Sequence, residues 1–257
     1  MSSYEGFAQV YDLFMEDIPY EQWAEYICEI WSKHSKEIKL VADLGCGTGN
    51  ITRILADKGY DMIGIDISES MLAKAMEKEK NAKNSSSVLY LNQDMREFEL
   101  YGTVDSIISI CDSINYITEE EDLLQVFKLV NNYLDPEGLF IFDINTIYKF
   151  ENILGCNSFG YTTDNSAYTW ENYYDKEECI NEFYTNFFVL DEESGQYNRF
   201  EEFHYEKGWT VEKITELLEK AGLKLLNVYD DNSFEPPNAT SQRVYFVAQE
   251  ITKCKEK

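Results

Sequence analysis

Residues 41–50 are Val41-Ala42-Asp43-Leu44-Gly45-Cys46-Gly47-Thr48-Gly49-Asn50, and this stretch decides the fold. The mainly apolar residues before the glycines predict a buried strand, and a helical pattern begins after the last glycine. Glycine adopts positive φ and lets a ligand approach the backbone closely. The free amides at a helix start favour anionic or strongly polar groups. The stretch therefore predicts a strand, a tight turn and a helix that bind a nucleotide-like ligand.

The spacing of the glycines indicates which nucleotide is bound. The dinucleotide fingerprint G-x-G-x-x-G places its last glycine three positions after the second, where this chain has Asn50. Here the last glycine, Gly49, comes one position earlier, and Asp43 lies two positions before Gly45. This pattern resembles the first motif of the class I S-adenosylmethionine (SAM)-dependent methyltransferases. A purely structural turn can have the same composition, so the rest of the chain must decide.

Two carboxylates follow the glycine turn at the ends of predicted strands. Strand 61–66 ends in Asp66, and an acidic residue ~20 positions after such a turn accepts hydrogen bonds from ribose hydroxyls. The resemblance implies that Asp94, at the exit of a strand that begins at Val88, binds the adenine amino group. A carboxylate is a suitable acceptor for an exocyclic amine. The cofactor residues that we predict are Asp43, Gly45, Cys46, Gly47, Gly49, Asp66, Ile67, Met71, Asp94, Met95, Cys111 and Asp112.

Strands and helices alternate over the first 145 residues. Val104 to Cys111 is the near-continuous apolar run typical of a parallel strand buried on both faces, and Leu139 to Asn145 predicts the fifth strand. Between them, residues 118–121 form a capping-box pattern before a helix, and residues 135–138 predict a turn. The alternation predicts an α/β fold with a doubly wound parallel sheet. The resemblance implies seven strands, the last of them antiparallel.

The alternation breaks after residue 145. Residues 146–208 are rich in aromatic and acidic side chains, and segments 168–173, 182–189 and 197–205 predict strands joined by polar turns. A helix at Thr210 and two further strands follow. We therefore predict a SAM-binding domain of residues 1–145 and 209–257, with an antiparallel β lid of residues 146–208 inserted after the fifth strand.

Candidate catalytic residues are few. Methyl transfer from a sulfonium depends mainly on alignment and on exclusion of water, and it needs a general base only if the acceptor arrives protonated. His204 is the one lid residue able to act as a base near neutral pH; the alternative is a solvated or hydrogen-bonded strand histidine. Tyr11 is the second candidate, because the pattern Phe7-Ala8 and Tyr11-Asp12 is shared with methyltransferases in which this segment closes the cofactor pocket. An aromatic stripe packed on the core is the alternative. For the substrate we predict contacts with Tyr4, Tyr116 and Trp170.

Composition limits the partners. With 22 basic and 48 acidic residues the formal net charge is -26, which repels phosphate backbones and anionic membranes. We therefore expect a small-molecule substrate, neither nucleic acid nor a membrane as partner, and a monomer or homodimer. The cysteines are scattered and only two histidines are present, so we expect no metal site. No signal-peptide or membrane-spanning pattern is seen, which predicts a cytoplasmic protein.

The sequence thus predicts an enzyme that moves a methyl group from SAM to a nitrogen or oxygen atom of a small molecule and releases S-adenosylhomocysteine. A non-catalytic SAM-binding or interaction protein is one alternative, because an intact cofactor site does not prove turnover. An NAD-dependent oxidoreductase is a weaker one, disfavoured by Asn50.

Overall fold

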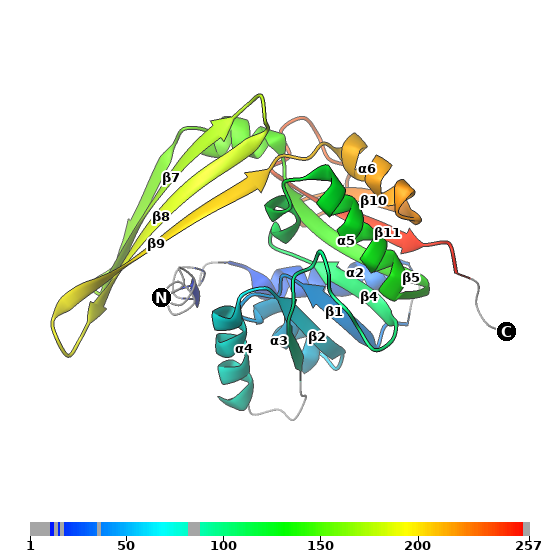
Figure 1. Cartoon of the computed structure of the whole chain (residues 1–257), viewed down its shortest axis with the longest axis horizontal. Coiled ribbons are helices and arrows are strands. Elements are labelled where there is room, and N and C mark those ends of the chain that lie inside the picture. The colour runs from blue at the N-terminus through cyan, green and yellow to red at the C-terminus, as the bar shows by residue number, and fades with distance from the viewer. Residues whose placement is uncertain (1–10, 13–14, 16–17, 35–36, 82–87, 254–257) are drawn as a thin grey trace.

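The computed structural model describes residues 11–12, 15, 18–34, 37–81 and 88–253. It has a body, in which helices cover both faces of a large sheet, and a smaller antiparallel sheet that projects from one end as a curved arm (Figure 1). Among the described residues, no helix combines the length and apolar character needed to cross a bilayer.

The large sheet contains seven strands in the order β10-β11-β5-β4-β1-β2-β3. Strand β11 runs antiparallel to its neighbours β5 and β10, and every other neighbouring pair is parallel. The predicted fold class is confirmed: the sheet is mainly parallel, and a separate antiparallel sheet accompanies it. The bounds are β1 (Leu40–Leu44), β2 (Asp61–Asp66), β3 (Leu89–Asn92), β4 (Val104–Ser109), β5 (Leu134–Asn145), β10 (Leu223–Asp230) and β11 (Arg243–Glu250).

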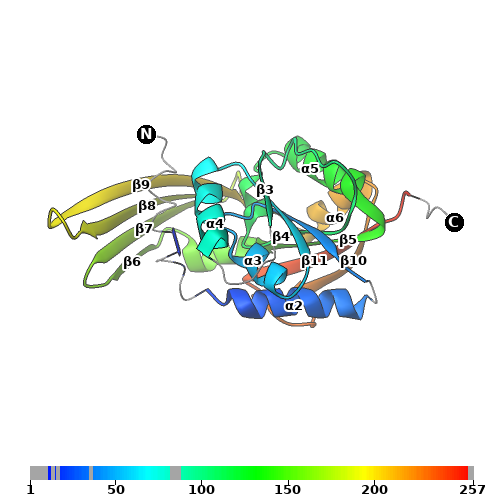
Figure 2. The ribbon, with the colours of Figure 1, turned by 90° about the horizontal axis from the view of Figure 1, so that it is seen from below.

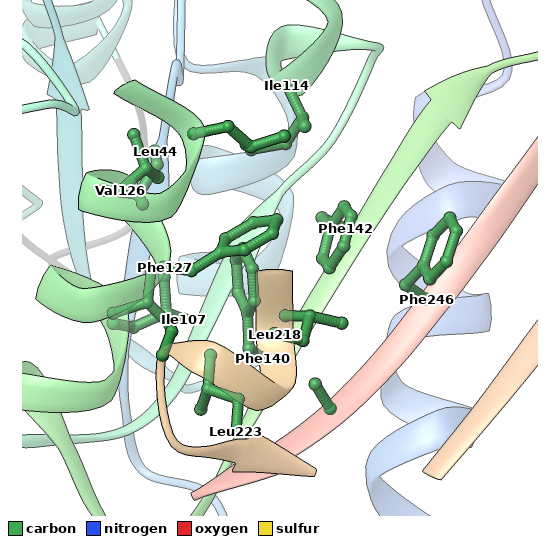
Figure 3. Packing of buried hydrophobic residues seen from close by; sticks show 14 of the residues in the cluster. Leu44, Ile107, Ile114, Val126, Phe127, Phe140, Phe142, Leu218, Leu223 and Phe246 are labelled. Atoms are coloured by element: carbon green, nitrogen blue, oxygen red, sulfur yellow. The ribbon is translucent and has the colours of Figure 1, made fainter. Parts of the chain in front are cut away.

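Helices cover the two faces of this sheet (Figure 2). On one face, α5 and α6 pack on an aromatic core in which Phe142 stacks on Phe246 with ring centroids 4.9 Å apart. Figure 3 shows Phe127 of α5 beside Phe140 and Phe142 of β5. On the other face, α2 and α3 bury Trp31 and other apolar side chains. The helices are α2 (Tyr20–Lys33), α3 (Asn50–Asp57), α4 (Glu69–Asn81), α5 (Glu120–Tyr133) and α6 (Val211–Lys220), with two short helices, η1 (Ser113–Tyr116) and η2 (Lys149–Leu154).

The smaller sheet, here called the lid sheet, has four strands, each antiparallel to the next. They are β6 (Ser158–Thr162), β7 (Ser166–Asp175), β8 (Ile180–Asp191) and β9 (Gln196–Lys207). The sequence predicted the last three. It missed β6 because every residue of this edge strand is exposed, so no alternation of buried and exposed positions marks it. The proposed domain boundaries remain a prediction.

Two local predictions were wrong in detail. Thr118 does not cap α5, which begins at Glu120 with Glu119 at its N-cap position and no side-chain cap bond. The predicted turn at residues 135–138 lies within β5, where the pairing with β4 shifts register and Glu137 has φ of 61°. A short irregularity in an otherwise paired strand and a true turn have the same residue preferences.

Candidate cofactor and acceptor site

The loops that follow β1, β2, β3 and β4 line a pocket of about 210 Å³. Open α/β sheets bind their ligands at this edge, outside the carboxyl ends of the strands. The pocket brings together predicted cofactor residues and one predicted substrate residue, namely Gly45, Asp66, Ile67, Asp94, Met95 and Tyr116. These residues are far apart in the sequence and meet because parallel strands end at the same edge.

Of the three glycines of the turn, Gly45 lines this pocket, whereas Gly47 and Gly49 do not. Gly45, Gly47 and Gly49 have φ of 74°, 53° and 75°, a region that side chains strongly disfavour. A Cβ at Gly45 would lie 2.6 Å from Ser113 Oγ, so the turn can approach η1 only without a side chain. A Cβ at Gly47 would meet nothing within 4 Å, so this side of the turn is open to a ligand.

Asp66 joins the turn to the end of β2. Its carboxylate accepts hydrogen bonds from the backbone amides of Gly47 and Ser68, each at 2.8 Å. Burial raises the pKa of this carboxyl, although both amide bonds act to lower it. A carboxylate has about four acceptor positions, so it can still accept from a ligand. Ser68 Oγ accepts from the amide of Met71, which fits the predicted cap of α4.

Asp94 is held by Arg96, a residue that no sequence pattern had indicated as part of the site. Arg96 Nε lies 3.0 Å from both carboxylate oxygens of Asp94, and a terminal nitrogen of Arg96 lies 3.1 Å from Asp122 Oδ2. The Arg96 guanidinium holds the pKa of the Asp94 carboxyl below its ordinary value. Arg96, Asp122 and Thr118 also line the pocket. Only the Asp-x-Arg spacing in the sequence could have indicated this pairing.

Other predicted cofactor residues do not line this pocket. Asp43 lies beneath the turn at 3% exposure, where Thr52 Oγ1 donates to its carboxylate at 2.6 Å. Burial raises the pKa of Asp43 to about 7. Met71 is buried on α4, and Cys46, whose amide donates to the Ile65 carbonyl, lies on the turn. These residues support the turn from behind, and their direct contact with a cofactor stays a prediction.

Cys111 and Asp112 form a strained turn at the end of β4. Both have positive φ, 67° and 55°, and both backbone amides donate to the carboxylate of Asp143, at 2.7 Å and 3.1 Å. Arg243 pairs with Asp143 and, at 2.6 Å, with Asp112. Burial would raise the pKa of Asp112, but Arg243 and Lys149 hold it below its ordinary value. The charges in this cluster therefore compensate one another.

The segment before α2 is tied to the glycine turn. Asp12 accepts hydrogen bonds from Thr48 Oγ1 at 2.7 Å and Asn50 Nδ2 at 3.1 Å, and it pairs with Lys78 of α4 at 2.7 Å. Its neighbour Tyr11 is a predicted catalytic residue whose pKa is raised well above its ordinary value, first by burial. The predicted substrate residue Tyr4 lies outside the described residues.

His204 of β9 reaches the pocket wall. Its Nδ1 lies 3.2 Å from the hydroxyl of Tyr116, and its ring stacks on Phe183 with centroids 4.5 Å apart. Burial lowers the pKa of His204 to about 4, so the imidazole is neutral at pH 7 and a weak base. Trp170, the third predicted substrate residue, belongs to the next row of the same lid-sheet face. In the described part of the chain, no group of three or more His, Cys, Asp or Glu side chains could hold a metal ion.

Comparison with known proteins agrees with this geometry. A family model described as a methyltransferase domain matches residues 41–138. A putative methyltransferase of Bacillus subtilis, YqeM, is 36% identical over 247 residues, which cover 96% of each chain. This chain belongs to the class I SAM-dependent methyltransferases. The crystal structure of such a methyltransferase from Clostridium acetobutylicum resembles this methyltransferase with a TM-score of 0.87 and 33% identity, over 96% of this chain and 99% of that one.

A third relative of the methyltransferase is named for its substrate. It is the dTDP-3-amino-3,4,6-trideoxy-alpha-D-glucopyranose N,N-dimethyltransferase of Streptomyces venezuelae, 28% identical over 137 residues, or 52% of this chain and 55% of its own. The family assignment makes this protein an enzyme that uses SAM.

Proposed function

We propose that this methyltransferase transfers a methyl group from SAM to a nitrogen or oxygen atom of a small molecule. The observation that carries the proposal is the contact between the hydroxyl of Tyr116, which lines the pocket, and His204, which lies on the lid sheet. This contact joins a nucleoside-sized site to an aromatic surface suited to a compact organic acceptor. The relative named as an amino-sugar methyltransferase supports a small-molecule acceptor.

The residues of the pocket fit the parts of SAM. We assign the ribose hydroxyls to Asp66, which keeps free acceptor positions beside its two amide bonds. The adenine amino group is assigned to Asp94, with Met95 and Ile67 supplying apolar contact. The open side of Gly47 leaves room for the remainder of the molecule against the backbone. Asp43, Met71, Cys46, Cys111 and Asp112 would act by shaping these surfaces.

When bound, SAM would supply an electrophilic methyl group, which would be transferred to an acceptor lone pair with loss of the carbon–sulfur bond; any proton on the acceptor would leave to bulk solvent after transfer. The protein contributes alignment and exclusion of water, for which positioning can supply ~7–11 kcal/mol. His204 is a weak base because burial lowers its pKa to about 4, so we assign it and Tyr116 to orienting the acceptor. Tyr11 keeps its proton at neutral pH and could donate a hydrogen bond.

Two measurements test the function. Calorimetry with SAM, S-adenosylhomocysteine and NAD should detect binding of the first two only. Methyl-labelled SAM, incubated with the enzyme and a metabolite extract, should then label a small molecule that mass spectrometry identifies. Binding of NAD without SAM would contradict the cofactor assignment. SAM binding with no transfer to any metabolite would favour the non-catalytic alternative.

A further inference from the structure

Four buried polar atoms of the lid sheet have no hydrogen-bond partner among the described residues. They are Trp170 Nε1, Asn181 Oδ1, Thr185 Oγ1 and Glu202 Oε1. An unpaired buried polar atom costs ~1–3 kcal/mol, and native proteins retain few of them. Four on one small sheet therefore need an explanation, and a ligand that supplies the missing partners is one.

The strand register places these atoms on one face. Trp170 of β7 pairs with Thr185 of β8, which pairs with Glu202 of β9, so the three form a row across the sheet. Directly paired residues point to the same face. Phe183 and His204 form the adjacent row on that face, because they lie two positions away along each strand. We call this the inner face, since His204 contacts Tyr116 at the pocket wall.

The inner face is aromatic as well as polar. The ring of Trp170 lies 5.8 Å from that of Phe183, which in turn stacks on His204. The rows are ~7 Å apart along a strand, so the row that contains Glu202 is the next one out from the row that reaches the pocket. A molecule of modest size could therefore lie on Trp170 and Phe183 while one end reaches the cofactor.

The buried carboxylate of Glu202 indicates which charge the ligand should have. It is only 1% exposed, and none of the ion pairs within the described residues includes it. A buried carboxylate without a cation is costly, and the cluster at Asp112 shows the usual solution, because Arg243 compensates it there. The ligand that would compensate Glu202 is a cation that also donates hydrogen bonds, and aromatic faces favour the same charge.

We propose that the inner face binds the acceptor molecule and that this molecule carries an amine, whose N–H groups donate to Glu202. Its carbon skeleton lies against Trp170 and Phe183, and Thr185 and Trp170 Nε1 bind its other polar atoms. This inference rests on the proposed function and narrows the substrate class to molecules that carry an amine: the amine at Glu202 anchors the molecule, and the atom that is methylated belongs to the end that reaches the cofactor. Glu202 is then a specificity-determining residue for the acceptor.

The test uses two probes that share a carbon skeleton, benzylamine and benzyl alcohol. Each is titrated into the full-length protein saturated with S-adenosylhomocysteine, and binding is followed by calorimetry or NMR. We expect benzylamine to bind at least ~10-fold more tightly than benzyl alcohol, a difference worth ~1.4 kcal/mol. Glu202→Gln, which keeps the shape of the side chain, should abolish this preference. Thermal unfolding of each variant reports whether it is folded.

The matched control is Glu201→Gln, on the same strand but exposed on the opposite face. It should retain the preference for benzylamine. Thr185→Val removes only a hydroxyl that is assigned to polar atoms neither probe has, so it should retain the preference for benzylamine, and it provides a second variant. Equal binding of the two probes, binding of neither, or a preference that survives Glu202→Gln would overturn the proposal.

The identity of the labelled product separates this inference from the function itself. A labelled product that carries an amino group, retained on a cation exchanger, supports both. A labelled product without an amino group contradicts the amine proposal while leaving the proposed function intact. If SAM binds and nothing is methylated, the proposed function fails, whereas the binding of benzylamine still tests whether the inner face recognises an amine.

Discussion

The pocket at the sheet edge and the inner face of the lid sheet satisfy their polar groups in opposite ways. At the pocket, two backbone amides already donate hydrogen bonds to the carboxylate of Asp66, and Arg96 already pairs with Asp94. On the inner face, Glu202 and Thr185 have buried atoms without partners among the described residues. The first site is assembled by the fold itself, whereas under our proposal the second is completed by the amine that it binds.

We expect the pocket to lose affinity for SAM when the hydrogen bonds that hold it together are removed. Asp66→Ala removes the acceptor of the Gly47 and Ser68 amides together with the proposed ribose contact. We expect SAM affinity to fall ~100-fold, or ~3 kcal/mol, measured by calorimetry. Asp61→Ala, at the exposed start of the same strand, should bind SAM as the wild type does. Unchanged affinity in Asp66→Ala would remove Asp66 from the site.

A second prediction concerns the shape of the turn. Gly45→Ala places a Cβ 2.6 Å from Ser113 Oγ at a φ of 74°. We expect the free energy of unfolding to fall by ~2 kcal/mol and SAM affinity to fall ~10-fold or more, because both strain and a displaced η1 alter the pocket. Gly102→Ala is the matched control, since nothing lies within 4 Å of its new Cβ. Denaturant unfolding and calorimetry together check this; equal behaviour of the two variants would refute it.

The buried Glu202 carboxyl should make the free energy of unfolding depend on pH. Burial raises the pKa of Glu202 to about 7 from an ordinary 4.5, so between these values the folded state binds more protons than the unfolded state. Stability should therefore be fully retained below about pH 4.5 and fall by ~1–2 kcal/mol as pH rises to 8. Denaturant unfolding at each pH measures the loss of stability in wild type and in Glu202→Gln. The difference between the two losses is the contribution of Glu202, separate from those of His204 and Glu206 on the same strand.

Two outcomes decide the pH prediction. Glu201→Gln should keep the wild-type dependence on pH, because its side chain is exposed on the outer face. If wild type and Glu202→Gln lose the same stability between pH 5 and pH 8, the Glu202 carboxylate is already compensated and the contrast with the pocket disappears.

The smallest effect is expected where the N-terminal segment meets the glycine turn and α4. Asp12→Asn keeps hydrogen bonding to Thr48 but removes the ion pair with Lys78. We expect KM for SAM to rise ~3-fold to 10-fold with the free energy of unfolding nearly unchanged, since a partly exposed ion pair contributes ~1 kcal/mol or less. Lys74→Met, which breaks an exposed pair with Glu77, is the control. A KM identical to that of the wild type would show that Asp12 does not help to hold the turn.

How far the site could be predicted depended on how local its signals are. The glycine turn and Asp66 follow from spacing within one strand–turn–helix unit, and the structure brings them to one pocket edge. The pairing of Arg96 with Asp94 and Asp122 was not predictable in full, because Asp122 joins it from a different helix. Asp43 shows the converse: it belongs to the motif by spacing, yet its carboxylate lies in the core beside Thr52.

The sequence by itself determined the alternation of strands and helices, the glycine turn and hence the use of SAM, because these depend on backbone conformation and periodicity over short stretches. Only the tertiary structure decided which polar groups find partners. Whether Asp112 meets Arg243, or Glu202 meets no cation among the described residues, depends on strands that are more than a hundred residues apart or on the register between neighbours. Burial and pairing are properties of that packing, and they carry the information about the acceptor that the sequence lacked.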